Sequence, residues 1–543
     1  MLVCLIFKDL LLERAVGMSE VCVELVGKLV GEMLGLSKEE LSPSDNLISL
    51  GLGSLDIMRI AGLLTKNGCN VTFSELVSNP CMASWVNFAR ERSARSSSNG
   101  SPLLGSANYS KGDPFPITSV QHAYMVGRRD GQELGGTACH AYMEFECGSL
   151  DAAKLERAVE LLILRHPMLR ARFSDDGTAR IEDKVTWKGL TTYRVEGAGN
   201  PDSRIEGIRQ ELSHLRFDIE QDDLIDVRLT VVSPKRTIMH INVDLLAADV
   251  LSIQVLLEDL AHLYDGTDLA PIEIDFMEYA RRTGIGEDAR NEDREYWLNR
   301  IDNMPGGPSL PLKAPMESVK RSQFTRMEYL IDSKSWKNFT EKGRQIGVTQ
   351  SMGIAAVYAK ALSRWSEDKK FLLNLPLFNR KPIHPDVDKI VSDFTSLILL
   401  EADCANAISL LELASQMQGR FQQDVAHSSF GAVEVLRELS HRCPNDPKKA
   451  PVVFASNIGT QFISNKVEDV FGPLSKMLAE TPQVLLDHQI YDHKNGLLLA
   501  WDYVSELLDD KIAKQMFEAY CTAVRFYCEN DWSEPFPDLL PPS

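Results

Sequence analysis

The 543-residue sequence has no stretch long and apolar enough to cross a bilayer, because a spanning helix needs about 20 consecutive apolar residues. Its first twelve residues are apolar, but Lys8 and Asp9 interrupt them, which leaves the run too short for the apolar part of a secretion signal. Met18 follows soon after. We therefore expect residues 1–17 to be a dispensable N-terminal extension.

Positive charge is also scarce, since 58 Lys and Arg residues face 77 Asp and Glu residues, a net charge of -19. Nucleic acid binding needs a basic surface, so nucleic acid is excluded as the main partner. The ten cysteines form no CxxC pair and have no zinc-like spacing. We expect reduced thiols, a cytoplasmic location and no metal site.

Short amphipathic patterns fill residues 18–95 and predict a small helical bundle. Ser19 can cap the first helix, Ser54 begins the second, and the third follows Pro80. Residues 96–112 are rich in Ser, Gly and Asn, a composition typical of a flexible linker.

Residues 113–543 form a long mixed α/β region, in which strand-like runs alternate with helix-like ones. The clearest are the strand-like runs 236–243, 371–376 and 451–455 and the helix-like run 253–263. A proline-rich break at 304–315 indicates a crossing between two lobes. We expect an N-lobe at about 113–285 and a C-lobe at about 286–543.

Ser54 lies in the run GLGSL, shortly after the tripeptide DNL at 45–47. This pattern resembles the phosphopantetheine attachment motif of carrier proteins, whose domain is a four-helix bundle. A phosphodiester at a helix N-terminus lies against free N–H groups at the positive end of the helix dipole. The alternative is an ordinary serine cap. Gly53 stands where many carriers have Asp or His. The resemblance implies 4'-phosphopantetheine bound covalently to Ser54.

Six further motifs are similar, in order, to those of heterocyclization domains of nonribosomal peptide synthetases. They are FPITSVQHAYMVGR (115–128), RHPMLR (165–170), DLLAADVLS (244–252), SDFTSL (392–397), PVVFAS (451–456) and TPQVLLDHQ (481–489). The third has the pattern DxxxxDxxS where amide-forming condensation domains have HHxxxDG. The whole resembles the N-terminal segments of pyochelin- and yersiniabactin-type siderophore synthetases. It implies a small all-α carrier followed by a two-lobed α/β cyclization domain like chloramphenicol acetyltransferase.

Asp244 and Asp249 lie five residues apart after a strand-like run. Such a pair suits acid–base chemistry or a metal, but each could equally cap a turn or pair with an arginine. The resemblance implies that both are needed for activity. We expect Asp249 to support the structure and Asp244 to face the site, and we interpret His166 and His488 as structural.

Asp487 ends the apolar run 484–486, a setting that desolvates a carboxyl group and raises its pKa. A carboxyl with a raised pKa can both accept and donate protons, so we expect Asp487 to transfer them. In the family, the matching aspartate works with a threonine, and Ala455 replaces that threonine here. Ser456 or Thr395 is a candidate for the missing hydroxyl, and the alternative is that the aspartate acts with water.

The resemblance implies that an aryl thioester is condensed with Cys, Ser or Thr on a downstream carrier and cyclodehydrated to a thiazoline or oxazoline in siderophore biosynthesis. No ATP-dependent activating module is visible. We therefore expect a separate ligase for salicylate or 2,3-dihydroxybenzoate, a phosphopantetheinyl transferase and a downstream module as partners. The alternatives are an enzyme that stops at the amide and a non-catalytic docking segment.

Overall fold

The computed structural model describes most of the chain. The described residues are 23–37, 40–66, 69, 71, 73–95, 112–195, 200–283, 287–378, 380–381, 383–443 and 448–538. Ser19 and nearly all of the predicted linker lie outside them. Within these ranges, no helix has the length and apolar character needed to span a membrane.

The first described segment is helical. Residues 23–34 form a helix, and α2 (Ser54–Lys66), α3 (Phe73–Ser78) and α4 (Met82–Arg95) follow. The predicted helices that start at Ser54 and after Pro80 are confirmed, whereas α3 was missed because six residues are too few for a periodic pattern. The buried Trp85 donates its indole N–H to the Leu76 carbonyl at 2.9 Å, which fastens α4 to α3.

The first half of the α/β region has a sheet covered by helices. The strands of this half are β1 (Phe115–Pro116), β2 (His140–Cys147), β3 (Ala171–Ser174), β4 (Thr178–Ile181), β5 (Thr191–Arg194), β6 (Ile225–Ser233) and β7 (Arg236–Asp244). Strands β1, β4 and β3 form a small separate sheet. The helices of this half are α5 (Ser119–Gly127), α6 (Ala152–Arg165), α7 (Pro201–Leu212), α8 (Val250–Tyr264) and α9 (Phe276–Thr283). A capping box between Thr118 and Gln121 begins α5, the helix of the 115–128 motif.

The second half has a larger sheet. The strands of this half are β8 (Phe324–Asp332), β9 (Lys370–Phe378), β10 (Thr395–Asp403), β11 (Val452–Gln461), β12 (Leu474–Glu480), β13 (Leu486–His493) and β14 (Gly496–Val504), and all except β12 form the larger sheet. The helices of this half are α10 (Glu287–Leu298), α11 (Ser333–Gln345), α12 (Gln350–Trp365), α13 (Leu410–Val425), α14 (Ala432–Arg442), α15 (Asn465–Phe471) and α16 (Asp510–Glu529). Helix α12 is buried along most of its length, as its run of Ala, Val and Ile requires.

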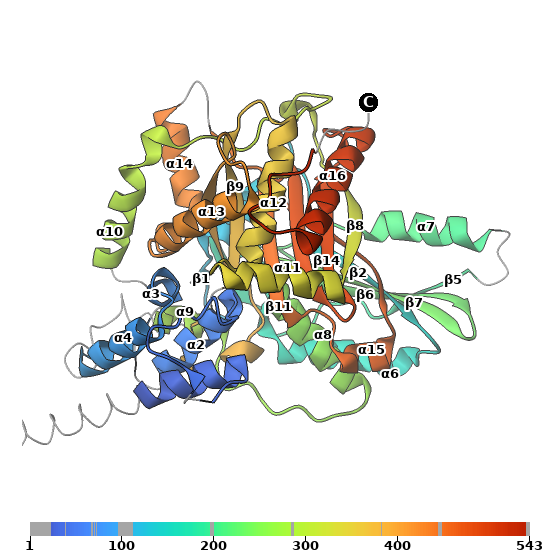
Figure 1. Ribbon diagram of the computed structural model, residues 1–543. Coiled ribbons are helices and arrows are strands. Elements are labelled where there is room, and N and C mark those ends of the chain that lie inside the picture. Colours follow the sequence, from blue (N-terminus) through green and yellow to red (C-terminus); the bar gives the residue numbers. More distant parts are fainter. Residues whose placement is uncertain are drawn as a thin grey trace, which may run out of the picture.

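Two main sheets form the lobes (Figure 1), and the strand orders are β12-β2-β7-β6-β5 and β10-β9-β11-β13-β14-β8. Helices α11, α12 and α16 lie across one face of the larger sheet. Strand β12 comes from the C-terminal half but pairs antiparallel with β2 of the first sheet. A division of the lobes at residue 285 does not anticipate this exchange, because a strand pattern does not reveal the strand's partner.

The helical segment before residue 96 packs against the second lobe (Figure 1). Helix α3 contacts α13, and the Arg344 guanidinium donates to the Leu50 carbonyl at 3.3 Å. The apolar side chains of α2 to α4 belong to the same buried cluster as the core of the second lobe. The N-terminus of α2 is therefore held near the start of α12 and the end of β11.

Candidate active site

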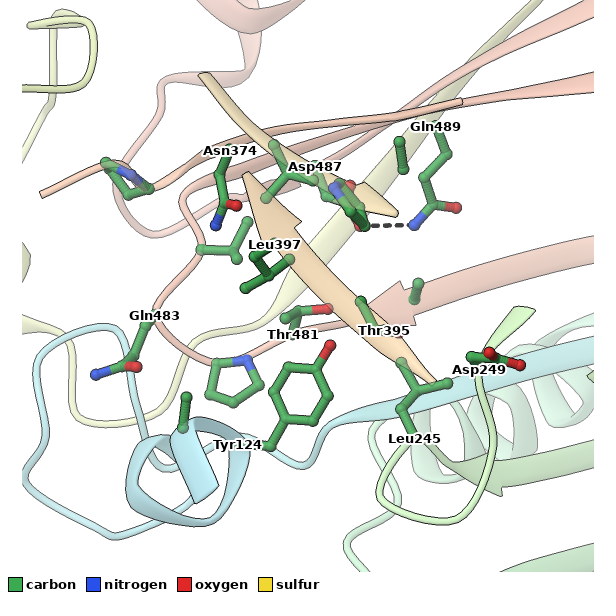
Figure 2. A pocket seen from close by; sticks show the side chains of 18 of the residues that line it. Tyr124, Leu245, Asp249, Asn374, Thr395, Leu397, Thr481, Gln483, Asp487 and Gln489 are labelled. Carbon is green, nitrogen blue, oxygen red and sulfur yellow. Dashed lines mark hydrogen bonds between the residues drawn. The ribbon is translucent and has the colours of Figure 1, made fainter. Parts of the chain in front are cut away.

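A cavity of about 500 Å³ lies between the lobes (Figure 2). Its lining comes from both lobes: Tyr124 of α5 and Asp249 at the start of α8 face Asn374 of β9, Ala455 of β11 and Asp487 of β13. We call this cavity the chamber. It brings together five of the six sequence motifs, because the loops and strand faces that carry them converge on it.

Asp487 lies in the chamber wall with only 6% of its surface exposed. Its Oδ2 accepts a hydrogen bond from Gln489 Nε2 at 2.6 Å, and its Oδ1 has no partner. Burial, and next the nearby Asp502 carboxylate, raise the pKa of Asp487 to about 7. This carboxyl can therefore give or take a proton near neutral pH.

The neighbours of Asp487 fix how it is held. Arg326 makes two hydrogen bonds to Asp502, at 2.7 and 2.8 Å, and also donates to Gln489 Oε1 at 2.8 Å. The Tyr491 hydroxyl donates to the same Gln489 oxygen. Because the oxygen of Gln489 is occupied, its amide N–H₂ must point at Asp487 (Figure 2).

The two candidate hydroxyls lie in different places. Thr395 lines the chamber, as do Asp487 and Ala455. Ser456 lies on the opposite face of β11, where it shares a 2.8 Å hydrogen bond with Ser351 and lines a separate pocket of about 60 Å³. Side chains alternate along a strand, so a residue adjacent to Ala455 cannot share its face. The structure thus brings Thr395 to the site and not Ser456.

Asp244 and Asp249 exchange the positions expected from the sequence. Asp244 is fully buried outside the chamber lining, and its carboxylate accepts two hydrogen bonds from Arg128, at 2.8 and 3.0 Å. Asp249 lines the chamber, caps α8 through the Ser252 amide at 2.7 Å and pairs with Arg380 at 2.9 Å. Asp249 therefore faces the site, and Asp244 is the buried structural member.

The DxxxxDxxS motif binds the SDFTSL motif directly. The Ser252 hydroxyl donates to the Ser392 carbonyl at 2.7 Å and accepts from the Ser392 amide at 3.1 Å. Asp249 Oδ2 accepts from the Phe394 amide at 3.3 Å. These contacts clamp the peptide on both sides of Asp393 against the start of α8.

Asp393 and Tyr124 are chamber residues that the sequence analysis quoted within motifs but did not select. Asp393 is 1% exposed, and burial raises its pKa to about 7. Burial also keeps the Tyr124 phenol neutral by raising its pKa. The sequence did contain a signal for both residues, because each has a titratable side chain inside one of the six motifs. Nothing in the sequence showed that these two side chains face the chamber.

The histidines have structural contacts, as interpreted. His166 Nε2 lies 3.0 Å from Asp259, and His488 contacts the Ala500 carbonyl and the Tyr520 hydroxyl on the helix side of the sheet. Burial lowers the pKa of His488 to about 3, so its ring stays neutral.

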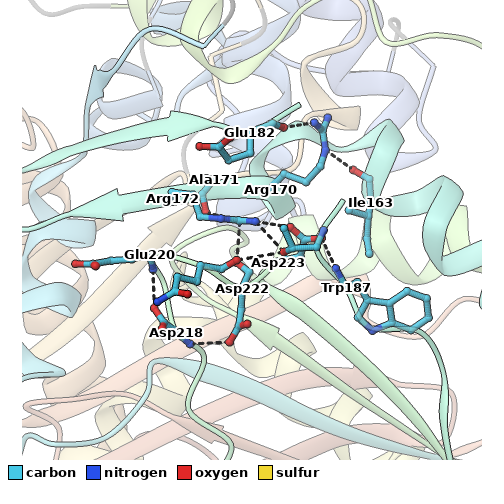
Figure 3. Close-up of polar contacts among 12 residues, drawn as sticks. Ile163, Arg170, Ala171, Arg172, Glu182, Trp187, Asp218, Glu220, Asp222 and Asp223 are labelled. Atoms are coloured by element: carbon cyan, nitrogen blue, oxygen red, sulfur yellow. Dashed lines mark hydrogen bonds and ion pairs between the residues drawn. The ribbon is translucent and has the colours of Figure 1, made fainter. Parts of the chain in front are cut away.

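The end of the RHPMLR motif also has a structural role (Figure 3). Arg170 donates to the Ile163 carbonyl at 3.2 Å, and the adjacent Arg172 pairs with the buried Asp223 at 2.8 Å. Asp223 in turn accepts from the Trp187 amide at 2.9 Å. The motif thus fastens the small β3–β4 hairpin to the first lobe.

Ser54 begins the 13-residue helix α2. The preceding Gly53 donates its amide to Asp56 Oδ2 at 2.9 Å. Gly53 and Asp56 line the 60 Å³ pocket, which shares Pro376 and Phe378 with the chamber. A serine at a helix N-terminus, the position of Ser54, fits a covalent phosphopantetheine group. No cluster of His, Cys, Asp and Glu suited to a metal occurs among the described residues.

The fold and the site define a carrier-linked enzyme whose two lobes enclose a chamber with buried carboxyls. Residues 115–529 match the model of the condensation domain, and residues 24–89 match that of the phosphopantetheine attachment site. The chain belongs to the condensation-domain family and has a carrier domain with a phosphopantetheine attachment site.

Relatives and solved structures agree with this assignment. The chain is 35% identical over 493 residues to phenyloxazoline synthase MbtB of Mycobacterium sp. (strain MCS), covering 90% of this chain and 42% of the relative. It is 33% identical to pyochelin synthetase PchE of Pseudomonas aeruginosa, covering 95% and 36%. The chain thus spans less than half the length of these relatives.

The structure is similar to the cyclization-docking bidomain of the nonribosomal peptide synthetase EpoB from Sorangium cellulosum. The TM-score is 0.73 at 29% identity, covering 84% of this chain and 93% of the other. The X-domain from teicoplanin biosynthesis, at 17% identity and a TM-score of 0.62, shares the fold. The predicted two-lobed α/β domain after a carrier is confirmed.

Proposed function

We propose that the chain joins a carrier-bound aryl thioester to the amine of a Cys, Ser or Thr acceptor and then closes a thiazoline or oxazoline ring. The names of the relatives MbtB and PchE support a place in siderophore biosynthesis, and the likeness to the EpoB cyclization domain supports ring closure. The phosphopantetheine would supply the thiol that carries the acyl group.

Ring closure has two proton-dependent parts. The acceptor's thiol or hydroxyl adds to the amide carbon, and its proton passes to the carbonyl oxygen. The C–O bond then breaks, the hydroxyl leaves as water with a proton from an acid, and the nitrogen loses its proton to form C=N. Asp487 is the acid that protonates the leaving hydroxyl, and its anion then takes the nitrogen's proton. The unpartnered Oδ1 is the atom available for both transfers. Thr395, the other hydroxyl candidate from the sequence, lines the same chamber.

Asp249 and Asp244 contribute by position in this proposal. Asp249, paired with Arg380, shapes the chamber end and holds the SDFTSL peptide. Asp244, paired with Arg128, keeps α5 attached to the end of β7. Both would be needed for activity without exchanging protons, because each carboxylate is already engaged by a guanidinium, Asp244 by Arg128 and Asp249 by Arg380.

We infer that the carrier is a four-helix bundle at residues 18–95, with the linker at 96–112, the cyclization domain at 113–543 and an extension before it at 1–17. The helix at 23–34 and helices α2, α3 and α4 support the bundle. The packing of α3 on α13 supports delivery from Ser54 into the chamber, because it holds the N-terminus of α2 beside the pocket that shares lining residues with the chamber.

The partners follow from the chemistry. A phosphopantetheinyl transferase would modify Ser54, a separate ligase would load salicylate or 2,3-dihydroxybenzoate, and a downstream module would present the acceptor. We infer that these reactions take place in the cytoplasm. Seven cysteines, at 81, 139, 147, 404, 443, 521 and 528, are free thiols, but Cys69 is disulfide-bonded, which contradicts the expectation that all the thiols are reduced.

The observation that carries the proposal is a buried carboxyl in the wall of the chamber, Asp487, whose Oδ1 has no hydrogen-bond partner. The test is to modify Ser54, load it with salicylate, add a cysteinyl or seryl carrier and weigh the product. A mass lower than that of the amide by one water indicates a ring. Only open-chain amide would refute ring closure.

One observation favours the alternative of an enzyme that stops at the amide. Ala455 provides no hydroxyl at the chamber position where the family has threonine. The same mass measurement decides between the two, and a chain that forms neither amide nor ring would instead be a docking segment.

A further inference from the structure

A second carboxyl in the chamber has no role in ring closure. Asp393 is 1% exposed, and its Oδ1 accepts from the Thr395 amide at 3.0 Å. Its Oδ2 is buried without a hydrogen-bond partner. In the part of the chain that the structure describes, no cationic side chain pairs with Asp393. A buried carboxylate without a cation is costly, so this position favours a proton or a positively charged ligand.

The protein fixes Asp393 from both sides. Ser252 holds the Ser392 peptide, and Asp249 accepts from the Phe394 amide. Arg380, the nearby guanidinium, pairs with Asp249. The unpartnered Asp393 oxygen is therefore held in a rigid segment of the chamber wall, while the local positive charge is paired elsewhere.

Asp393 lies far along the sheet from Asp487. Asp487 is in register with Val453, Val453 with Asn374, and Asn374 with Leu399 of β10. Leu399 is four residues after Thr395, the first residue of β10, which is roughly 13 Å along the strand, and Asp393 lies two residues before Thr395. A single five-membered ring cannot contact carboxyls so far apart. The two carboxyls must therefore serve different steps.

The step that remains is amide formation, whose nucleophile arrives positively charged. An α-amine has a pKa of about 8 and is mostly protonated at neutral pH. It cannot attack a thioester until it loses a proton. Burial and the Asp249 carboxylate raise the pKa of Asp393 to about 7, close to that of the amine, so the proton can move between them at little cost.

We propose that Asp393 binds the protonated amine of the acceptor and accepts its proton before the amide forms. This inference rests on the proposed function. The carboxylate takes one proton from the ammonium group, the freed lone pair attacks the thioester carbon, and the C–S bond breaks. The second proton that the nitrogen loses goes to the departing thiolate, so atoms and charges balance. The substrate class is an aminoacyl thioester with a free primary amine.

The test separates the two steps in the full, loaded chain. Each of the variants Asp393→Asn and Asp487→Asn is assayed with two sets of substrates. The first set is the salicyl thioester plus a cysteinyl carrier, which requires amide formation and ring closure. The second is a salicyl-cysteinyl carrier in which the amide already exists, which requires ring closure alone. Asp393→Asn should lower amide formation about a hundredfold and raise KM for the acceptor, yet close the ring of the preformed amide at the wild-type rate. Asp487→Asn should show the reverse.

Asp424→Asn is the control for loss of a buried carboxyl elsewhere, since Asp424 is fully buried with one unpartnered oxygen and lies outside the chamber, where its other oxygen accepts from Arg300 and Tyr296. It should leave both rates unchanged. The inference is overturned if Asp393→Asn forms amide at the wild-type rate, if it loses ring closure of the preformed amide, or if Asp424→Asn is equally impaired. A wild type that forms amide without a ring would refute the proposed function and leave this inference standing.

If Asp393→Asn does not fold, wild-type enzyme provides a second measurement. Two competitors of the cysteinyl carrier are compared: a seryl carrier, which has the amine, and a 3-mercaptopropionyl carrier, which lacks it. The carrier without the amine should inhibit at least about tenfold more weakly. Equal competition would overturn the inference, because binding would then not depend on the amine.

Discussion

Replacing Asp487 by asparagine should change stability and activity in opposite directions. The side chains have nearly the same shape, so the exchange removes a titratable group and leaves the packing in place. Ring closure should fall by about two to four orders of magnitude, because no acid remains to protonate the leaving hydroxyl. Amide formation should continue, so the open-chain product should accumulate.

The stability change can be worked from the pKa. Burial and Asp502 raise the pKa of Asp487 from 3.8 to about 7, and each unit corresponds to about 1.4 kcal/mol. Below pH 4 the carboxyl is protonated in both folded and unfolded chains, so its ionisation costs nothing. As the pH rises from about 4 to about 7, the unfolded chain ionises first and the folded state loses about 4 kcal/mol, which stays lost above pH 7. Asparagine has no such cost.

Urea unfolding at pH 4 and pH 8 measures this difference. The free energy of unfolding of the Asp487→Asn variant should equal that of wild type at pH 4 and exceed it by about 3–4 kcal/mol at pH 8. Asp244→Asn is a suitable comparison, because it removes a carboxylate paired with the buried Arg128. The free energy of unfolding of that variant should be about 3–5 kcal/mol lower than that of wild type at pH 8.

The pH dependence of the rate supplies a second measurement. With a preformed amide as substrate, wild-type ring closure should fall about tenfold per pH unit above pH 7, because the acid form of Asp487 is consumed. An Asp487→Asn variant that closes the ring at the wild-type rate, or one that is destabilised equally at pH 4 and pH 8, would refute the reasoning.

Three other substitutions test separate parts of the site. Ala455→Thr restores a chamber hydroxyl in register with Gln489, and should raise the ring-closure rate up to about tenfold when product mass is followed over time. Arg380→Gln leaves Asp249 buried without its cation, so the free energy of unfolding, measured with urea at pH 8, should fall by about 3–5 kcal/mol. Modification of the carrier should not change in this variant. Ser54→Ala should abolish the mass gain on incubation with a phosphopantetheinyl transferase while leaving the unfolding midpoint unchanged.

Much of the fold could be predicted because its elements are long and patterned. The runs 236–243, 371–376 and 451–455 lie in strands β7, β9 and β11, and the run 253–263 lies in helix α8. What the pattern could not show is which strands pair. The exchange of β12 into the first sheet depends on side-chain contacts with β2 that are more than 300 positions away in the sequence.

The site was predicted less evenly. Asp487 follows from a local feature, the apolar run before it, and its buried position in the chamber agrees with that reasoning. The position of Ser456 could have been found in advance, since a strand residue next to Ala455 must face the other way. The exchange of roles between Asp244 and Asp249 could not, because it depends on Arg128 and Arg380, which lie far from them in the sequence.

The pKa of Asp487 results from two opposed influences, and the protein controls both. Burial and Asp502 favour the protonated acid, whereas the Gln489 amide, held in place by Arg326, favours the anion. A pKa near 7 lets one carboxyl donate to the leaving hydroxyl and then accept from the nitrogen.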